Sequence, residues 1–115
     1  MRPIDYFFRS VKKSPNSLFL LDQDVKYSYL ESQERILRVS RSLYGAGFKI
    51  GDSVAVYSGN NAEAVICVFS CMCSGGAWIP VNIRNSPETN AEYMAYVRTK
   101  WLFFHSDACQ KGVFP

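Results

Sequence analysis

Residues that commonly bind metal ions are scarce in this 115-residue sequence. His105 is the only histidine, and the four cysteines form no C-x2-C pair of the kind that marks a structural zinc site. On a helix, Cys67 and Cys71 share one face, whereas Cys73 points away from it. A zinc site would need both His105 and Cys109 from the distant C-terminal region, so we predict no metal site. We predict instead that these cysteines are reduced and pack as small residues in the core.

Signals for secretion or membrane insertion are also lacking. Charged residues interrupt the N-terminal segment, and no small-residue cleavage site follows it, so we expect no signal peptide. The uncharged residues 64–81 reach the lower length limit of a membrane span, but Gly75, Gly76 and Pro80 break this stretch. We therefore expect a cytoplasmic protein without a transmembrane segment, in which residues 64–81 form a buried helix followed by a strand.

Motifs for catalysis or phosphate binding are absent, including Walker A, nucleophile-elbow and H-E-x-x-H sequences. The glycine pairs in residues 45–47 and 75–76 follow predicted helices, where the helix dipole repels anions. Residues 57–63 (YSGNNAE) lead from a predicted strand into a helix, which is the right polarity for binding a phosphate. There, Gly59 and Asn60 either expose backbone N–H groups to an anion, or Asn60 is simply the N-cap. We assign no catalytic, cofactor-binding or metal-binding residue.

Two further features leave function open. His105 follows a predicted strand at the edge where α/β proteins place their sites, with Asp107 as its only nearby partner. Residues 1–49 contain nine Lys or Arg and five Asp or Glu, whereas the rest of the chain contains four and five. This excess is compatible with an anionic partner, such as a nucleotide, CoA, RNA or a membrane surface, but a solvated helix face is the favoured interpretation.

Hydrophobic periodicity and capping signals predict an α/β fold. Apolar residues at helical spacing predict a helix over residues 4–13, and two short apolar runs predict a hairpin over residues 18–29. Ser28 opens the next helix with a capping box, and Ser86 opens a later one before Pro87. Beyond Ser28 the predicted order is helix, strand, helix, strand, helix, strand, which implies a Rossmann-like parallel sheet with flanking helices.

Burial on these elements can also be predicted. The helix after Ser28 is expected to turn five apolar side chains inward: Leu30, Ile36, Leu37, Leu43 and Tyr44. The strands in residues 53–58 and 101–105 are predicted to be buried on both faces, because both are almost wholly apolar. A third strand is predicted in residues 78–82.

Residues 27–106 resemble the N-terminal region of adenylate-forming enzymes, the superfamily of acyl-CoA synthetases, luciferases and peptide-synthetase adenylation domains. The resemblance lies in a Ser-Tyr helix start, a helix ending in G-x-x-x-G-D-x-V-A, an Asn before the next helix, and a closing G-G-x-x-x-P-x-N. The matching positions are Ser28, Tyr29, Leu30, Leu43, Gly47, Gly51, Asp52, Val54, Ala55, Asn60, Gly75, Gly76, Pro80 and Asn82.

The resemblance implies a parent enzyme that uses ATP, Mg and CoA to activate a carboxylic acid, such as a fatty acid, and convert it to a thioester. The family's Ser/Thr/Gly-rich phosphate loop, adenine and ribose motifs and catalytic lysine have no counterpart in this sequence. We therefore expect an inactive, truncated N-terminal segment that binds none of these cofactors itself. Residues 1–27 are predicted as a helix and small hairpin, and residues 28–115 as a partial Rossmann-like subdomain.

Two alternatives to the ligase segment remain from the sequence. A non-enzymatic α/β module that docks on a partner chain would also keep this fold, because a half-sheet leaves apolar surface and an open strand edge. A basic-face RNA binder is the third possibility, although we expect no nucleic acid as a partner. For the ligase segment the expected partner is the rest of the ligase, and for the docking module it is another chain.

Overall fold

The structure is a computed structural model that describes residues 2–23, 25–57, 61–81 and 84–104. Its elements follow in chain order: α1 (Pro3–Lys13), β1 (Leu18–Asp22), β2 (Val25–Ser28), α2 (Tyr29–Gly45), β3 (Ser53–Tyr57), α3 (Ala62–Cys73), β4 (Ala77–Pro80), α4 (Pro87–Tyr96) and β5 (Trp101–Phe104). The predicted alternation of helices and strands beyond Ser28 is confirmed.

Local sequence signals explain where the helices begin. At α2, the Ser28 hydroxyl accepts a hydrogen bond from the Glu31 N–H (3.1 Å), and the Glu31 carboxylate accepts one from the Ser28 N–H (2.9 Å). At α4, the Ser86 hydroxyl accepts from the Thr89 N–H (3.1 Å). Both predicted N-caps are confirmed, because these bonds satisfy N–H groups that have no partner within the helix.

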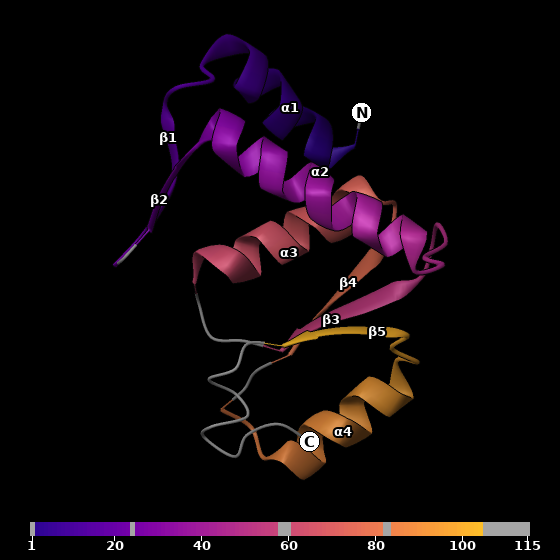
Figure 1. Cartoon of the computed structure of the whole chain (residues 1–115). Coiled ribbons are helices and arrows are strands. Elements are labelled where there is room, and N and C mark those ends of the chain that lie inside the picture. Colours follow the sequence, from indigo (N-terminus) through magenta and orange to yellow (C-terminus); the bar gives the residue numbers. More distant parts are fainter. Residues whose placement is uncertain (1, 24, 58–60, 82–83, 105–115) are drawn as a thin grey trace.

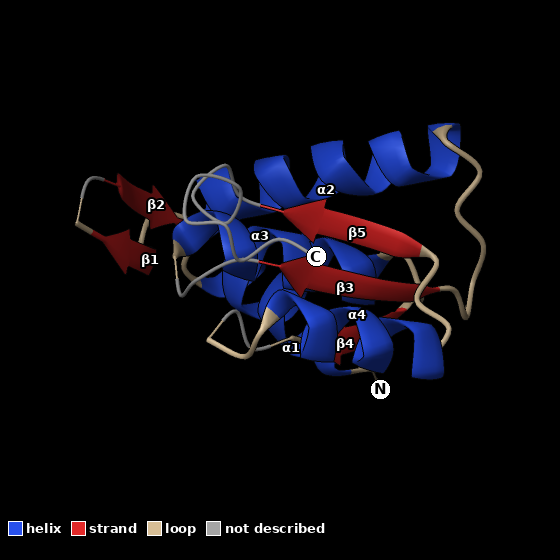
Figure 2. Cartoon of the chain, turned by 90° about the horizontal axis from the view of Figure 1, so that it is seen from below, coloured by secondary structure: helices blue, strands red, loops and turns tan. Residues whose placement is uncertain are grey.

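The strands form two sheets. β1 and β2 pair antiparallel as the predicted hairpin, and β3 lies between β4 and β5 in a parallel sheet of order β4-β3-β5. Helices α2 and α3 lie on one side of this parallel sheet and α4 on the other (Figures 1 and 2). Because all three strands run the same way, their amino ends meet at one edge of the sheet and their carboxyl ends at the other.

The stretch 64–81 is a helix, a tight turn and a strand, as predicted. α3 ends at Cys73, Gly75 has a φ of +78° in the turn, and β4 begins at Ala77. A left-handed φ of this size favours glycine, because it has no Cβ. Among the described residues, no helix combines the length and hydrophobicity needed to cross a membrane.

The prediction for the buried face of α2 is wrong at two positions. Leu30 and Tyr44 are 39% and 55% exposed, whereas Ser32 and Ser40 are buried together with Ile36 and Leu43. The buried residues form one stripe along α2, and Leu30 and Tyr44 lie about 80–120° around the helix from its centre at Ile36. Ser40 of this stripe meets the end of α3, where its hydroxyl oxygen lies 2.5 Å from that of Ser74.

The prediction of full burial holds for β3 but not for β5. Val54, Ala55, Val56 and Tyr57 of β3 are all buried, because β3 is the central strand with helices on both faces. Leu102 of β5 remains 37% exposed. Within the described residues β5 pairs only with β3, so its other edge has no strand neighbour.

A core of aromatic rings joins the N-terminal helix and hairpin to the rest of the chain. Phe7 of α1 packs against Phe19 of β1 and Phe69 of α3, with ring centroids 4.9 and 5.3 Å apart. Ile36 and Ile66, both buried, extend the same cluster. The division at residues 27 and 28 stays a prediction, and we propose that residues 1–27 form an outer layer that shares this core.

Candidate functional site

The cysteines of α3 pack as side chains of the core. Cys71 is fully buried and packs with Leu43, Phe48 and Val54, which confirms its predicted role. Burial raises the pKa of the Cys67 and Cys71 thiols to about 11. Because the thiolate is the reactive form, both thiols remain protonated and unreactive at neutral pH. Among the described residues, no three His, Cys, Asp or Glu side chains are grouped to hold a metal ion.

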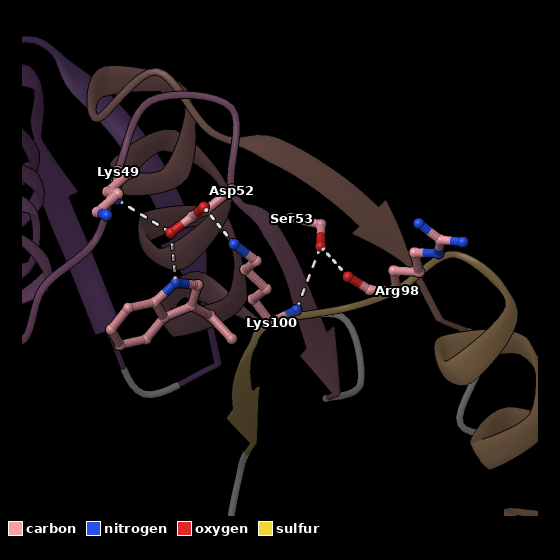
Figure 3. A network of polar contacts seen from close by, with 6 residues as sticks. Lys49, Asp52, Ser53, Arg98 and Lys100 are labelled. Atoms are coloured by element: carbon pink, nitrogen blue, oxygen red, sulfur yellow. Dashed lines mark hydrogen bonds and ion pairs between the residues drawn. The ribbon is translucent and has the colours of Figure 1, made fainter.

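The largest polar network described lies at the amino edge of the parallel sheet, around Asp52 (Figure 3). One carboxylate oxygen of Asp52 accepts hydrogen bonds from the Lys49 N–H (3.0 Å) and the Trp101 indole N–H (3.1 Å). The other pairs with the Lys100 ammonium group at 3.3 Å. The Asp52 carbonyl accepts from the Ala77 N–H (2.9 Å). Asp52 therefore connects the starts of β3, β4 and β5.

Ser53 extends this network to the turn that precedes β5 (Figure 3). Its hydroxyl donates to the Arg98 carbonyl (2.8 Å) and accepts from the Lys100 N–H (3.2 Å). Arg98 has a φ of 56°, which is uncommon for a residue other than glycine. The bond from Ser53 thus holds an otherwise unfavourable turn, and the network as a whole is a structural clasp.

Asp52 predicts how stability depends on pH. Hydrogen bonds from Lys49, Trp101 and Lys100 lower the pKa of the Asp52 carboxyl in the folded chain. Asp52 therefore stabilises the fold fully above its unfolded pKa of about 3.9, and this stabilisation is lost as the pH falls through its lower pKa in the folded chain. We expect Asp52→Asn to unfold at lower urea than the wild type at pH 7 and to lose less stability on acidification. Urea titrations between neutral and acidic pH measure this difference.

Lys100→Gln is the matched control for Asp52→Asn. The Lys100 side chain is 67% exposed, and exposed ion pairs contribute little, so its urea midpoint should stay close to the wild type. Parallel pH profiles of the wild type and Asp52→Asn would show that Asp52 does not act as this clasp.

The amino end of α3 is the candidate anion site predicted from residues 57–63. Asn61 is the N-cap, and its side chain accepts from the Ala64 N–H (2.8 Å), while Asn60 lies outside the described residues. A carboxylate oxygen of Asp22, from the hairpin, accepts from the Ala62 N–H (3.1 Å). The chain's own carboxylate therefore already occupies the place that an anion would take at this terminus.

The hairpin is fixed beside α3 by a second set of side chains. The Tyr27 hydroxyl donates to the Glu63 carboxylate (3.1 Å), and the Arg35 guanidinium lies 4.4 Å from the centre of the Tyr27 ring. Burial of Tyr27, followed by its contact with Glu63, raises the pKa of the phenol. Tyr27 therefore stays protonated at neutral pH and keeps its hydrogen bond to Glu63, which holds the hairpin beside α3.

The carboxyl edge of the sheet is where α/β folds place their ligands. There the Asn90 side chain of α4 donates to the Tyr57 hydroxyl at the end of β3 (3.0 Å), and both side chains are buried. The residues that the sequence analysis considered near this edge, Gly59, Asn60, His105 and Asp107, fall outside the described residues, as do Asn82 and Cys109. The described part of this edge therefore contains a packed hydrogen bond and no assigned site residue.

Comparison with known sequences shows which enzymes share these motifs. The sequence matches the AMP-binding enzyme family over residues 7–113. The chain belongs to that family. This match confirms the resemblance to adenylate-forming enzymes that the sequence predicts over residues 27–106.

Similar family members make different products. The chain is 32% identical to the crotonobetaine/carnitine–CoA ligase of Escherichia fergusonii over 84 residues, which are 73% of this chain and 14% of that protein. It is 28% identical to the phenyloxazoline synthase MbtB of Mycobacterium tuberculosis over 88 residues, or 76% of this chain and 6% of that protein. The chain thus spans a small part of the length of these relatives.

A solved structure supports the fold of this AMP-binding family member. The O-succinylbenzoate coenzyme A synthetase MenE of Bacillus subtilis, solved with AMP, superposes with a TM-score of 0.85 at 19% identity. The match covers 93% of this chain and 28% of MenE. Identity at this level shows the fold alone, so the AMP site of MenE is not assigned to residues here.

The described amino ends of α3 and α4 are capped by side chains of the chain itself. The N–H groups at the amino ends of α3 and α4 bond to the chain's own side chains of Asp22, Asn61 and Ser86. The described residues also offer no group of acidic ligands for Mg. We therefore derive no chemical step for these residues.

Proposed function

We propose that this chain is the N-terminal part of an acyl-CoA ligase-like enzyme. The complete enzyme would activate a carboxylic acid, such as a fatty acid, with ATP and Mg, and would transfer the acyl group to CoA. The residues of this chain would form scaffold for that reaction in the cytoplasm. By itself the chain is inactive.

The family match over residues 7–113 carries this proposal. The 32% identity with a CoA ligase favours CoA over a carrier protein as acceptor of the acyl group. Inactivity of the chain alone is supported by the position of the polar residues. The clasp around Asp52 lies at the amino edge of the sheet, and ligands of α/β proteins bind at the opposite edge.

The partner in this proposal is the remainder of the ligase, and β5 is the edge best suited to it. The Lys100 N–H bonds to the Ser53 carbonyl of β3, so the alternate residues Trp101 and Phe103 direct their backbone polar groups to the open side. β4 ends in Pro80, which has no N–H to donate. An added strand therefore finds more hydrogen-bonding groups at β5 than at β4.

The proposal predicts no turnover by the chain alone. With ATP, Mg and a panel of fatty acids of different length, the 115-residue chain should release pyrophosphate at the rate of a protein-free control. The genomic sequence downstream should continue in frame into a Ser/Thr/Gly-rich loop, and the longer product should turn over. Clear turnover by the 115-residue chain, or a long frame without that loop, would contradict the proposal.

The open β5 edge also favours a second candidate, a non-enzymatic module that docks on another chain. In that case the chain should form dimers or larger species on size-exclusion chromatography, and no longer product of the same frame should be found. A clean monomer argues against an exposed half-core.

A further inference from the structure

The net positive charge of this protein is concentrated at its N-terminus. The whole sequence contains 13 Lys or Arg and 10 Asp or Glu. Four of those cations and only one of the acids, Asp5, lie in residues 2–13. The rest of the chain is therefore balanced, and the entire excess of three charges belongs to α1 and the residue before it.

α1 separates its apolar and basic residues onto opposite sides. The side that enters the core carries Ile4, Phe7 and Val11. At 100° per residue, the opposite stripe carries Arg2, Tyr6, Arg9 and Lys13, which lie within about 60° of one another. All four are exposed, and no acid lies in the stripe. Asp5 lies beside it and pairs with Arg2 at 3.6 Å, and the Arg9 guanidinium lies 5.8 Å from the centre of the Tyr6 ring. Residues 2–13 together keep a net charge of +3, from four Lys or Arg and one Asp.

The basic stripe of α1 is accessible to a flat surface. α1 is an outer layer, separated from the parallel sheet by α2 and α3 (Figure 1). It therefore lies away from β5, where the remainder of a ligase would attach. The outward side of α2 differs from that of α1, because it carries charges of both signs: Glu31, Glu34, Arg35, Arg38 and Arg41.

We propose that the basic stripe of α1 binds the surface of an anionic phospholipid bilayer. Lys and Arg side chains close to such a surface are attracted by its negative potential. The exposed Tyr6 suits the headgroup region, where tyrosine is enriched in membrane proteins. The apolar side of α1 remains in the core, so binding is peripheral and electrostatic. RNA is disfavoured, because single-stranded RNA stacks on several aromatic rings and the stripe contains only one.

Vesicle sedimentation tests the proposal with the full 115-residue chain. The chain should bind vesicles of phosphatidylcholine with about a third phosphatidylserine at low salt, and should not bind pure phosphatidylcholine. Raising the ionic strength to about 0.5 M should release it, because salt screens exposed charges. Arg9→Glu/Lys13→Glu should lower the partition coefficient more than about tenfold.

Arg38→Glu/Arg41→Glu is the matched control, since it changes the net charge equally but lies on α2. It should retain most of the binding, and circular dichroism should show both variants folded. Should Arg9→Glu/Lys13→Glu unfold, the neutral pair Arg9→Gln/Lys13→Gln takes its place. Equal loss in both pairs, no binding at low salt, or tighter binding to labelled oligouridine than to the vesicles would each overturn the proposal.

Discussion

Phe7→Ala should lower the free energy of unfolding by about 3–5 kcal/mol, the range for removing a buried aromatic ring. Phe7 is 5% exposed and touches rings from three other elements: Phe19, Tyr29 and Phe69. The substitution would leave a cavity between α1, the hairpin and α3. Urea unfolding followed by far-UV circular dichroism measures the effect.

The same variant tests whether the N-terminal layer folds together with the sheet. Both tryptophans of the sequence, Trp78 and Trp101, lie in the sheet, so their fluorescence reports on it. We expect Phe7→Ala to shift the fluorescence transition as far as the circular dichroism transition. Tyr6→Ala, at a 59% exposed neighbour, should change stability by less than about 0.5 kcal/mol. An unchanged fluorescence transition in Phe7→Ala would show that residues 1–27 fold separately.

Gly76→Ala should destabilise the chain by about 3 kcal/mol, at the upper end of the usual cost of overpacking. A Cβ at Gly76 would lie 2.6 Å from a ring carbon of Phe48, 3.0 Å from the Cys71 sulfur and 3.1 Å from the Asp52 carbonyl oxygen. Phe48 and Cys71 are buried, and the Asp52 carbonyl already accepts the Ala77 N–H, so none of the three can move freely.

Gly45→Ala is the control for Gly76→Ala. Gly45 is the last residue of α2, and a Cβ there would meet no atom within 4 Å. Alanine favours helix over glycine by up to about 1 kcal/mol, so Gly45→Ala should be neutral or slightly stabilising in the same urea titration. Equal urea midpoints for Gly76→Ala and the wild type would contradict the packing described around Gly76.

Much of the fold could be predicted because its signals are local. The capping box at Ser28, the cap at Ser86 and the glycines after α2 and α3 each act within a few residues of their own position. The alternation of helices and strands then restricts the sheet to parallel crossovers. The resemblance to the family rested on the spacing of the same turns, and the family match over residues 7–113 confirms it.

The polar clusters could not be predicted, because their members are distant in sequence. Asp52 reads as part of a turn, yet it accepts a hydrogen bond from the indole of Trp101, 49 residues away. A buried indole N–H needs an acceptor, but the sequence does not identify which one. Asp22 likewise caps a helix that begins 40 residues further along the chain. Of the two alternatives for the start of α3, an anion site is therefore disfavoured, because the Asp22 carboxylate already accepts a hydrogen bond from the Ala62 N–H there.

Sequence alone determined the order of elements, the parallel sheet, the family and the basic character of the N-terminus. Tertiary structure decided which side of each element is buried. Leu30 and Tyr44 are exposed and Ser40 is buried, because the side of α2 that faces the core is the one that carries Ile36 and Leu43. It also showed that Arg9 and Lys13 lie on the exposed side of α1, because Phe7 and its apolar neighbours turn the other side into the core.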